Sequence, residues 1–248
     1  MKIQQLALVT MGAVIFLASN VFAAPVVNVV ESPDNAPGVS QPVSPYDLVD
    51  ESSPALLSES WSGHTSFSGS TPDVLNDGSP GGPPDGGWNL NANEGAVTTQ
   101  KTPWTLTYML DTSIAPQGYD ISSIEAMSLW LNDYVNQHYS VAIATVGNPS
   151  FTSLIDDVTA NEQVLGPNDA ASSLKTVITD DTGVLATNVI GVQFLFETQP
   201  QTYAPLTGDT LAAYKEIDVY GTISVPEPAA GTLLLVACGL LALCRRGA

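Results

Sequence analysis

Two histidines, His64 and His138, are the first residues of the chain to consider for catalytic chemistry. They are too few for a three-histidine zinc site, and no Gly-x-Ser-x-Gly motif supplies a serine nucleophile beside either of them. Cys238 and Cys244 both lie close to the C-terminal end, so residues 24–225 contain no thiol for a disulfide, a metal or a nucleophile. We therefore predict that the protein is not an enzyme.

Carboxylates are the most numerous side chains of the chain that could act in catalysis. It contains 25 Asp and Glu residues against six Lys and Arg, which gives a net charge of −19. The adjacent pairs Asp156-Asp157 and Asp180-Asp181 are typical of solvated turns. A glycosidase is defined by the separation of two carboxylates in the fold, which a sequence does not give. A glycan-active hydrolase of the extracellular matrix is therefore the alternative function.

The same acidic composition narrows the range of partners. Lys101, Lys175 and Lys215 are the only basic residues between positions 24 and 225. A surface with so few cations repels phosphate backbones, so we predict no nucleic-acid binding. Clustered carboxylates suit a hard cation such as calcium, which binds several oxygen ligands, although they also suit a plain acidic surface.

One stretch combines an aromatic ring with polar side chains. Trp130 precedes a polar segment that reaches Gln137 and His138. Exposed tryptophans stack on sugar rings while neighbouring polar groups bind the hydroxyls, so these three residues are the predicted ligand contacts and an extracellular polysaccharide is the predicted partner. The alternative is that the tryptophan packs in the core.

Strands must position these residues, because the hydrophobic pattern of the middle of the chain has a period of two. The expected strands are Trp104–Leu110, Ile121–Leu131, Tyr139–Val146, Leu174–Thr179, Val189–Glu197 and Tyr214–Val225. Residues 154–165 are expected to form a helical turn. The pattern predicts an all-β, antiparallel β-sandwich of the jelly-roll type over residues 60–224, preceded by an extended, Pro- and Ser-rich lead-in over residues 24–59.

The N-terminus has the pattern of a secretory signal peptide over residues 1–23. Lys2 is followed by an apolar stretch from Leu6 to Ala18 and by small residues that end at Ala23, after which we expect cleavage. The apolar stretch is shorter than the roughly 20 residues of a spanning helix, although an uncleaved anchor is the alternative. The protein is thus predicted to be exported.

The C-terminus, residues 225–248, carries three ordered elements. A Pro-Glu-Pro motif is followed by an apolar span over residues 229–243, expected to be a transmembrane helix, and then by two arginines that stay cytoplasmic. The residues of these motifs are Pro226, Glu227, Pro228, Arg245 and Arg246. This layout resembles the PEP-CTERM sorting signal, which implies an exosortase-type membrane protease as partner. It also implies transient anchoring in the inner membrane and then delivery to the cell surface or extracellular matrix. An ordinary tail anchor is the alternative.

Short motifs in the middle of the chain also resemble a known family. They are Asn76-Asp77-Gly78, Tyr119-Asp120-Ile121, Trp130, Gln137-His138-Tyr139-Ser140-Val141 and the segment from Tyr214 to Gly221. Together they resemble the galactose-binding-like (discoidin-type) domains of PEP-CTERM proteins. The resemblance implies an eight-stranded jelly roll, carbohydrate binding, and a structural calcium held by Asn76, Asp77 and Glu216. The alternative is that Asp77 forms a simple turn and that Glu216 faces solvent.

Overall fold

The structure is a computed structural model of the 248-residue chain. It describes residues 25–32, 44, 46–64, 71–78, 97–98, 103–131, 136–160, 171–197 and 212–225. The expected cleavage site at Ala23, the sorting motif at residues 226–228, the span at 229–243 and the terminal arginines at 245–246 lie outside these residues. Within the described ranges, no helix is both long and apolar enough to cross a membrane.

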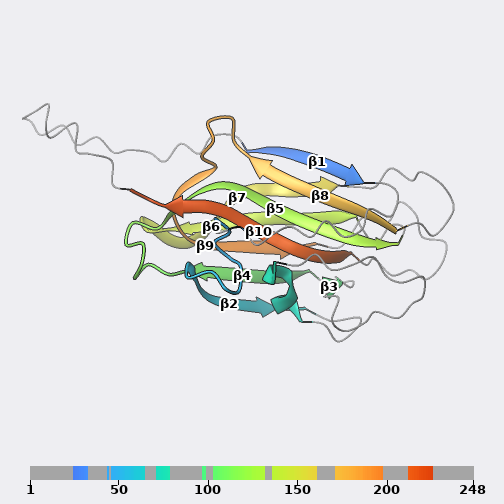
Figure 1. Cartoon of the computed structure of the whole chain (residues 1–248), viewed down its shortest axis with the longest axis horizontal. Coiled ribbons are helices and arrows are strands. Elements are labelled where there is room, and N and C mark those ends of the chain that lie inside the picture. The colour runs from blue at the N-terminus through green and yellow to red at the C-terminus, as the bar shows by residue number, and fades with distance from the viewer. Residues whose placement is uncertain are drawn as a thin grey trace, which may run out of the picture.

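Ten antiparallel strands and one short 3-10 helix make up the described part of the chain (Figure 1). They are β1 (Val26–Ser32), β2 (Leu56–Ser62), η1 (Pro72–Asn76), β3 (Val97–Thr98), β4 (Trp104–Leu110), β5 (Tyr119–Leu131), β6 (Gln137–Thr145), β7 (Asn148–Ala160), β8 (Ala171–Thr179), β9 (Ala186–Phe196) and β10 (Ala213–Ile223). The predicted all-β class is therefore confirmed, with two more strands than the eight expected.

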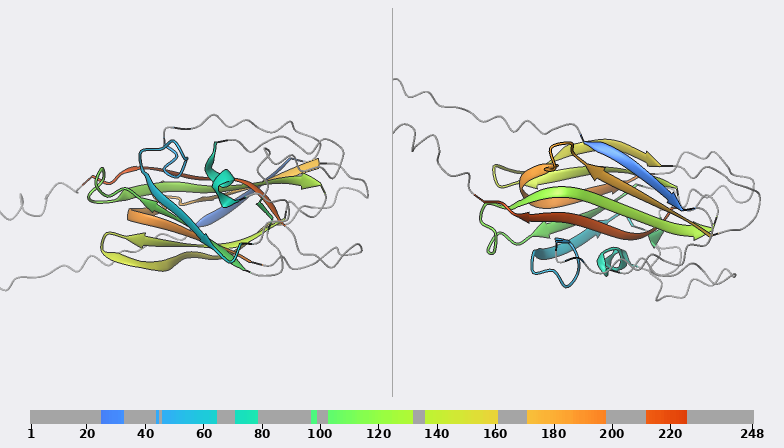
Figure 2. Two further views of the ribbon diagram at one scale, coloured as in Figure 1. Left: turned by 90° about the horizontal axis from the view of Figure 1, so that it is seen from below. Right: turned by 45° about the horizontal axis from the view of Figure 1, so that its top comes forward.

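The strands form two stacked layers, which Figure 2 shows from two further directions. One layer has the order β1-β8-β5-β10-β3, and the other has the order β2-β4-β9-β6-β7. The first residues of β9 pair with the start of β5, where Tyr119 lies opposite Val189, and this pairing joins the layers at one end. The architecture is an antiparallel β-sandwich.

The core lies between the layers and follows the alternation that the sequence predicts. Every second residue of β4, from Trp104 to Leu110, is buried. Phe196 of β9 stacks on Trp104 with ring centroids 4.2 Å apart. The ring of Tyr214 in β10 contacts the ring of Phe196, with centroids 4.6 Å apart. These aromatic contacts close the end of the sandwich at which β4 begins and β9 ends.

Two expectations about the boundaries of the domain are wrong. Residues 24–59 are not a lead-in outside the sheet, because β1 pairs with β8 along its whole length and β2 pairs with β4. Between these strands, Leu48 and Val49 are buried in the core. Residues 154–160 belong to strand β7 rather than to a helical turn, because their backbone pairs with β6. The prolines near residues 33–54 hid the first of these features, since they break the hydrophobic pattern on which the prediction rests.

Gly118 and Gly183 allow a matched test of packing, because both have φ near +80°. A Cβ added to Gly118 would lie 2.6 Å from the carbonyl carbon of Asn188, whereas a Cβ on Gly183 would meet nothing within 4 Å. Gly183→Ala should therefore cost only the strain of a left-handed alanine, about 1–2 kcal/mol. Gly118→Ala should cost roughly 2–5 kcal/mol, because about 1–3 kcal/mol of overpacking is added to the strain. Urea unfolding measures both, and equal losses would contradict the packing argument.

Candidate functional site

Residues 46–50 and η1 line one edge of β10, and the first candidate site lies along this edge. Residues 46–50 lie along β10, with the Leu48 amide donating to the carbonyl of Val219 at 2.8 Å, and η1 packs beside them. As a result Glu216 and Asp218, which point away from the core as their alternation predicts, are only 2 % and 9 % exposed. Carboxylates without water need other partners, because burial penalises their charged form.

Asn76, Asp77 and Glu216, the three predicted calcium ligands, are brought together here. The amide of Gly78 donates to Oε1 of Glu216 at 3.2 Å, which ties the loop after η1 to the last strand. Asn76 is 1 % exposed and its Nδ2 donates to the carbonyl of Val49 at 2.6 Å. The charge of Asp77 is one of the causes that raise the pKa of Glu216. The three residues therefore lie close together, and calcium binding by them stays a prediction.

Glu59 of β2 is a fourth member of this group, which we call the Glu216 cluster (Glu59, Asn76, Asp77 and Glu216). Three buried oxygens of the cluster have no hydrogen-bond donor: Oε1 of Glu59, Oδ1 of Asn76 and Oε2 of Glu216. Burial raises the pKa of Glu216 to about 9, with further increases from Asp218 and Asp77, and raises that of Glu59 to about 7. Sequence analysis missed Glu59 because only the folded chain brings β2 beside η1.

A calcium ion would suit this donor set. Calcium binds carboxylate, amide and backbone oxygens, and the cluster offers one oxygen from each of two carboxylates and one amide oxygen that lack donors. Among the described residues, no group of three or more His, Cys, Asp or Glu side chains is arranged to hold a metal. Any ion here would therefore depend on the oxygen of Asn76 and on backbone carbonyls as well as on Glu59 and Glu216.

Asp47 and Asp218 form a separate buried pair along the same edge of β10. Oδ1 of Asp47 accepts from the amides of Val49 and Val219 at 3.1 and 3.0 Å, which holds residues 46–50 against β10. Burial raises the pKa of Asp47 to about 7, and a side-chain hydrogen bond joins it to Asp218. This pair is structural, because Oδ1 of Asp47 holds residues 46–50 in place along β10.

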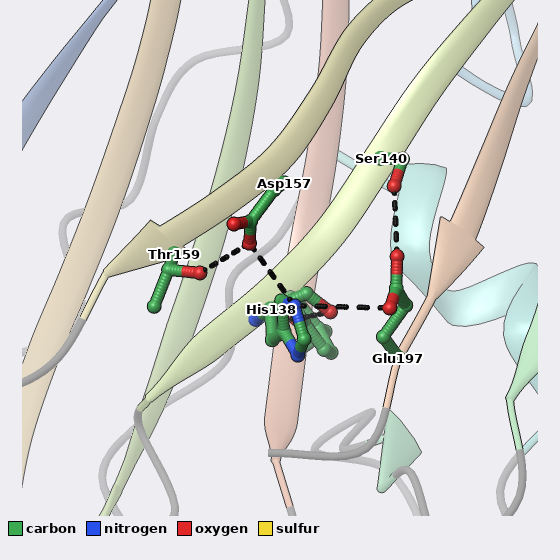
Figure 3. A network of polar contacts seen from close by, with 6 residues as sticks. His138, Ser140, Asp157, Thr159 and Glu197 are labelled. Atoms are coloured by element: carbon green, nitrogen blue, oxygen red, sulfur yellow. Dashed lines mark hydrogen bonds and ion pairs between the residues drawn. The ribbon is translucent and has the colours of Figure 1, made fainter. Parts of the chain in front are cut away.

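The second candidate site is a group of polar side chains on the outer face of the other layer, shown in Figure 3. Nε2 of His138 lies 3.2 Å from Oδ1 of Asp157 and 3.8 Å from Oε2 of Glu197. Oγ of Ser140 donates to the second oxygen of Glu197 at 2.9 Å, and Oγ1 of Thr159 donates to Asp157 at 2.7 Å. We call these five residues the His138 cluster.

Three strands supply the His138 cluster: β6, β7 and the end of β9. His138 and Ser140 alternate with Tyr139 and Val141, which point into the core. Asp157 has φ 57°, a left-handed conformation that is uncommon outside glycine and that often marks functional positions. Its side chain is 75 % exposed, against 17 % for His138. The cluster therefore combines a half-buried imidazole with solvent-facing carboxylates.

Gln137, the second predicted ligand contact, does not join this cluster. Gln137 is fully buried, and the two hydrogens of its amide nitrogen, Nε2, are shared among the carbonyls of Ala126 and Leu174 and Oγ of Ser128. The expectation that this glutamine faces a ligand is wrong, because the alternation that exposes His138 turns its neighbour inward. The backbone of Trp130 lies in β5, and its side chain is outside the described part of the structure.

Comparisons with known proteins give limited guidance. No protein-family model and no curated protein matches this chain. Among solved structures, the chain is similar to allantoicase from Saccharomyces cerevisiae, with a TM-score of 0.43 and 14 % identity over 73 % of this chain and 45 % of that one. The chain thus spans less than half the length of the allantoicase.

Two carbohydrate-binding modules of family 32 are also similar. The module of AlyQ in complex with 4,5-unsaturated mannuronic acid has a TM-score of 0.37 and 10 % identity over 66 % of this chain and 95 % of its own. The first such module of a family 31 glycoside hydrolase from Clostridium perfringens has a TM-score of 0.37 and 12 % identity, over 71 % and 99 % respectively. With such low scores, these likenesses support no statement about ligand or activity, which must rest on the side chains.

Proposed function

We propose that this chain is an exported surface or matrix protein whose sandwich binds carbohydrate at the His138 cluster without being an enzyme. The observation that supports binding is the convergence of five polar side chains on an open outer face, in Figure 3. Carboxylates, an imidazole and hydroxyls that lie together can accept from and donate to the hydroxyls of a sugar. The core does not need these side chains, since the inward positions of β6 already fill it.

Export and sorting are proposed from the two ends of the sequence. The signal pattern that ends at Ala23 would carry the chain across the inner membrane, and an exosortase-type protease would recognise Pro226, Glu227 and Pro228. The arginines at 245–246 would hold the tail on the cytoplasmic side until cleavage. This placement puts the acidic sandwich where extracellular polysaccharide is available.

Calcium is proposed as a structural ion at the Glu216 cluster. It would be held by Glu59, Asn76 and Glu216, whose buried oxygens lack donors, with Asp77 supplying further negative charge nearby. When bound, the ion neutralises carboxylates that burial otherwise penalises. Its role here is to fasten η1 and the loop after it to β10.

Binding is tested with residues 24–225, which contain every described strand. On a glycan array of neutral, amino and uronic-acid oligosaccharides in calcium buffer, we expect selective retention. His138→Ala and Asp157→Asn should weaken it by at least tenfold. Asp156→Asn is the matched control, because it removes the same charge from the neighbouring residue, whose carboxylate accepts from Ser153 instead. Retention that is unchanged by His138→Ala would contradict the assignment.

A glycan hydrolase is the second candidate, and one observation favours it. Asp157 and Glu197 both lie within 4 Å of the same imidazole nitrogen of His138. Two carboxylates around one position are the minimum for glycoside hydrolysis. Release of reducing ends from a bound oligosaccharide, abolished by Glu197→Gln, would establish the hydrolase and overturn the non-enzymatic proposal.

A further inference from the structure

A hollow of about 370 Å³ lies at the end of the sandwich where β10 finishes and β5 begins. Its walls include Tyr46, Val184 and Tyr220, and its polar positions include Asp120, Ser122 and Thr222. We call it the Tyr46 hollow. Its size is near the lower limit of the roughly 300–1,000 Å³ that is common for small-molecule sites, which suits one or two sugar rings.

The Tyr46 hollow is far from the His138 cluster. Ala186, the first residue of β9, pairs with Ile121 at the hollow. After the last residue of the same strand, the amide of Glu197 donates to the carbonyl of His138. A strand rises about 3.3 Å per residue, so the length of β9 places the two features roughly 30 Å apart.

Tyr46 presents an aromatic face that the backbone holds in place. Its side chain is 61 % exposed, while its amide donates to Oγ of Ser44 and its carbonyl accepts from the amide of Gly221 at 3.0 Å. An exposed ring on a fixed backbone loses little conformational freedom when a ligand stacks on it. Aromatic residues with one exposed face are common platforms for amphipathic ligands.

The opposite wall is also fixed. Val184, 41 % exposed, follows a turn in which the amides of Thr182 and Gly183 donate to Asp180. Thr222 is an exposed hydroxyl beside the hollow, and Oγ of Ser122 donates to the carbonyl of Tyr220 at 3.1 Å. Two apolar walls with hydroxyls between them match the apolar ring faces and polar rim of a sugar.

Charge decides which sugars fit. Among the described residues, no Lys, Arg or His lines the hollow, whereas Asp120, which carries a carboxylate, does. That carboxylate accepts from the amide of Asn188 and from Oγ of Ser224, so it is fixed in place. An anionic sugar would find no counter-charge here and would face a chain of net charge −19.

We infer that the Tyr46 hollow is a second carbohydrate site, selective for neutral sugars over uronic acids. This inference rests on the proposed function, since it adds a site to the binding proposed at the His138 cluster. Sites at opposite ends would let one molecule hold two glycan chains. Such bridging gains avidity from the effective concentration of the second site.

The test is an amide-shift titration of ¹⁵N-labelled residues 24–225 in calcium buffer. The probes are cellotriose, triacetylchitotriose and galactotriose as neutral sugars, and trigalacturonate as the acidic one. We expect at least one neutral probe to shift the amides of Tyr46, Ser122 and Val184, and trigalacturonate to leave them unchanged. Tyr46→Ala should weaken that binding at least tenfold. Trp61→Ala is the control, because Trp61 is another exposed ring, on β2, and should leave it intact.

The outcomes separate the two sites. Shifts confined to the His138 cluster, or hollow binding that survives Tyr46→Ala, would overturn the inference while leaving the proposed function in place. Equal binding of trigalacturonate at the hollow would overturn the selectivity for neutral sugars. Shifts at the Tyr46 hollow alone, unchanged by His138→Ala, would support the inference and contradict the assignment of binding to the His138 cluster. Shifts at neither site with any probe would overturn both proposals.

Discussion

Raising the pH from 5 to 9 in the presence of a chelator is expected to lower the melting temperature of residues 24–225. Burial raises the pKa of Glu216 to about 9 and the pKa values of Glu59 and Asp47 to about 7. In the unfolded chain these groups ionise near pH 4. The folded state thus holds protons that the unfolded state has released, so stability is full below pH 4 and is lost progressively up to pH 9.

Calcium should remove most of this loss and should help more as the pH rises. The ion would bind the ionised carboxylates of Glu59 and Glu216, so protons compete with it strongly at pH 5 and less at pH 9. At a concentration one hundred times its dissociation constant, a ligand adds about 2.7 kcal/mol. For a domain of this size that corresponds to a rise of roughly 5–10 °C in melting temperature. Scanning calorimetry across the pH range, with calcium or with chelator, measures the effect.

Glu216→Gln tests whether the stabilisation by calcium depends on this carboxylate rather than on the overall negative charge of the domain. The amide cannot ionise, so the variant should lose the calcium response and should show a flatter pH dependence in chelator. Glu51→Gln is the matched control, because Glu51 is exposed and directly follows residues 46–50, which lie along β10. A melting temperature that does not respond to calcium at any pH would rule out the ion, whatever the pH dependence shows.

The sandwich was predictable because its central strands follow a simple alternation. In β4, Trp104 and Tyr108 point inward while Thr105 and Thr107 do not, and a period of two shows this directly. The position of residues 46–50 was not predictable, because alternation places Glu216 outside the core but does not show which segment lies along the edge of β10. A local pattern records which face a side chain is on, not what later packs against that face.

The candidate site shows the same division. Alternation from Tyr139 gives Gln137 an inward direction and His138 an outward one, so a stricter use of the pattern would have separated them. No sequence pattern indicated that Asp157 and Glu197 would lie beside His138. Asp157 and Glu197 come close only because β7 and β9 flank β6, and strand order is set by pairing across the whole chain.

Replacing Gln137 with leucine is expected to cost roughly 3–5 kcal/mol of folding free energy while leaving glycan binding unchanged. The buried amide donates to three acceptors at 2.9–3.1 Å, and its Oε1 accepts from Oγ1 of Thr176 at 2.8 Å. Leucine keeps the approximate volume but leaves carbonyls and hydroxyls buried without donors, at about 1–3 kcal/mol for each unsatisfied group. Chemical unfolding gives the loss, and the glycan array gives the binding.

Adding Thr176→Val to Gln137→Leu tests whether the loss comes from unsatisfied polar groups. Thr176 also shares a hydrogen bond of 2.6 Å with the hydroxyl of Tyr139, so the valine alone should be destabilising. In the double variant the leucine no longer faces a hydroxyl that has lost one of its partners, and the combined loss should be smaller than the sum of the two single losses. Strict additivity would show that the two side chains do not act as one network. Loss of glycan binding in a folded Gln137→Leu variant would instead return this residue to the ligand site.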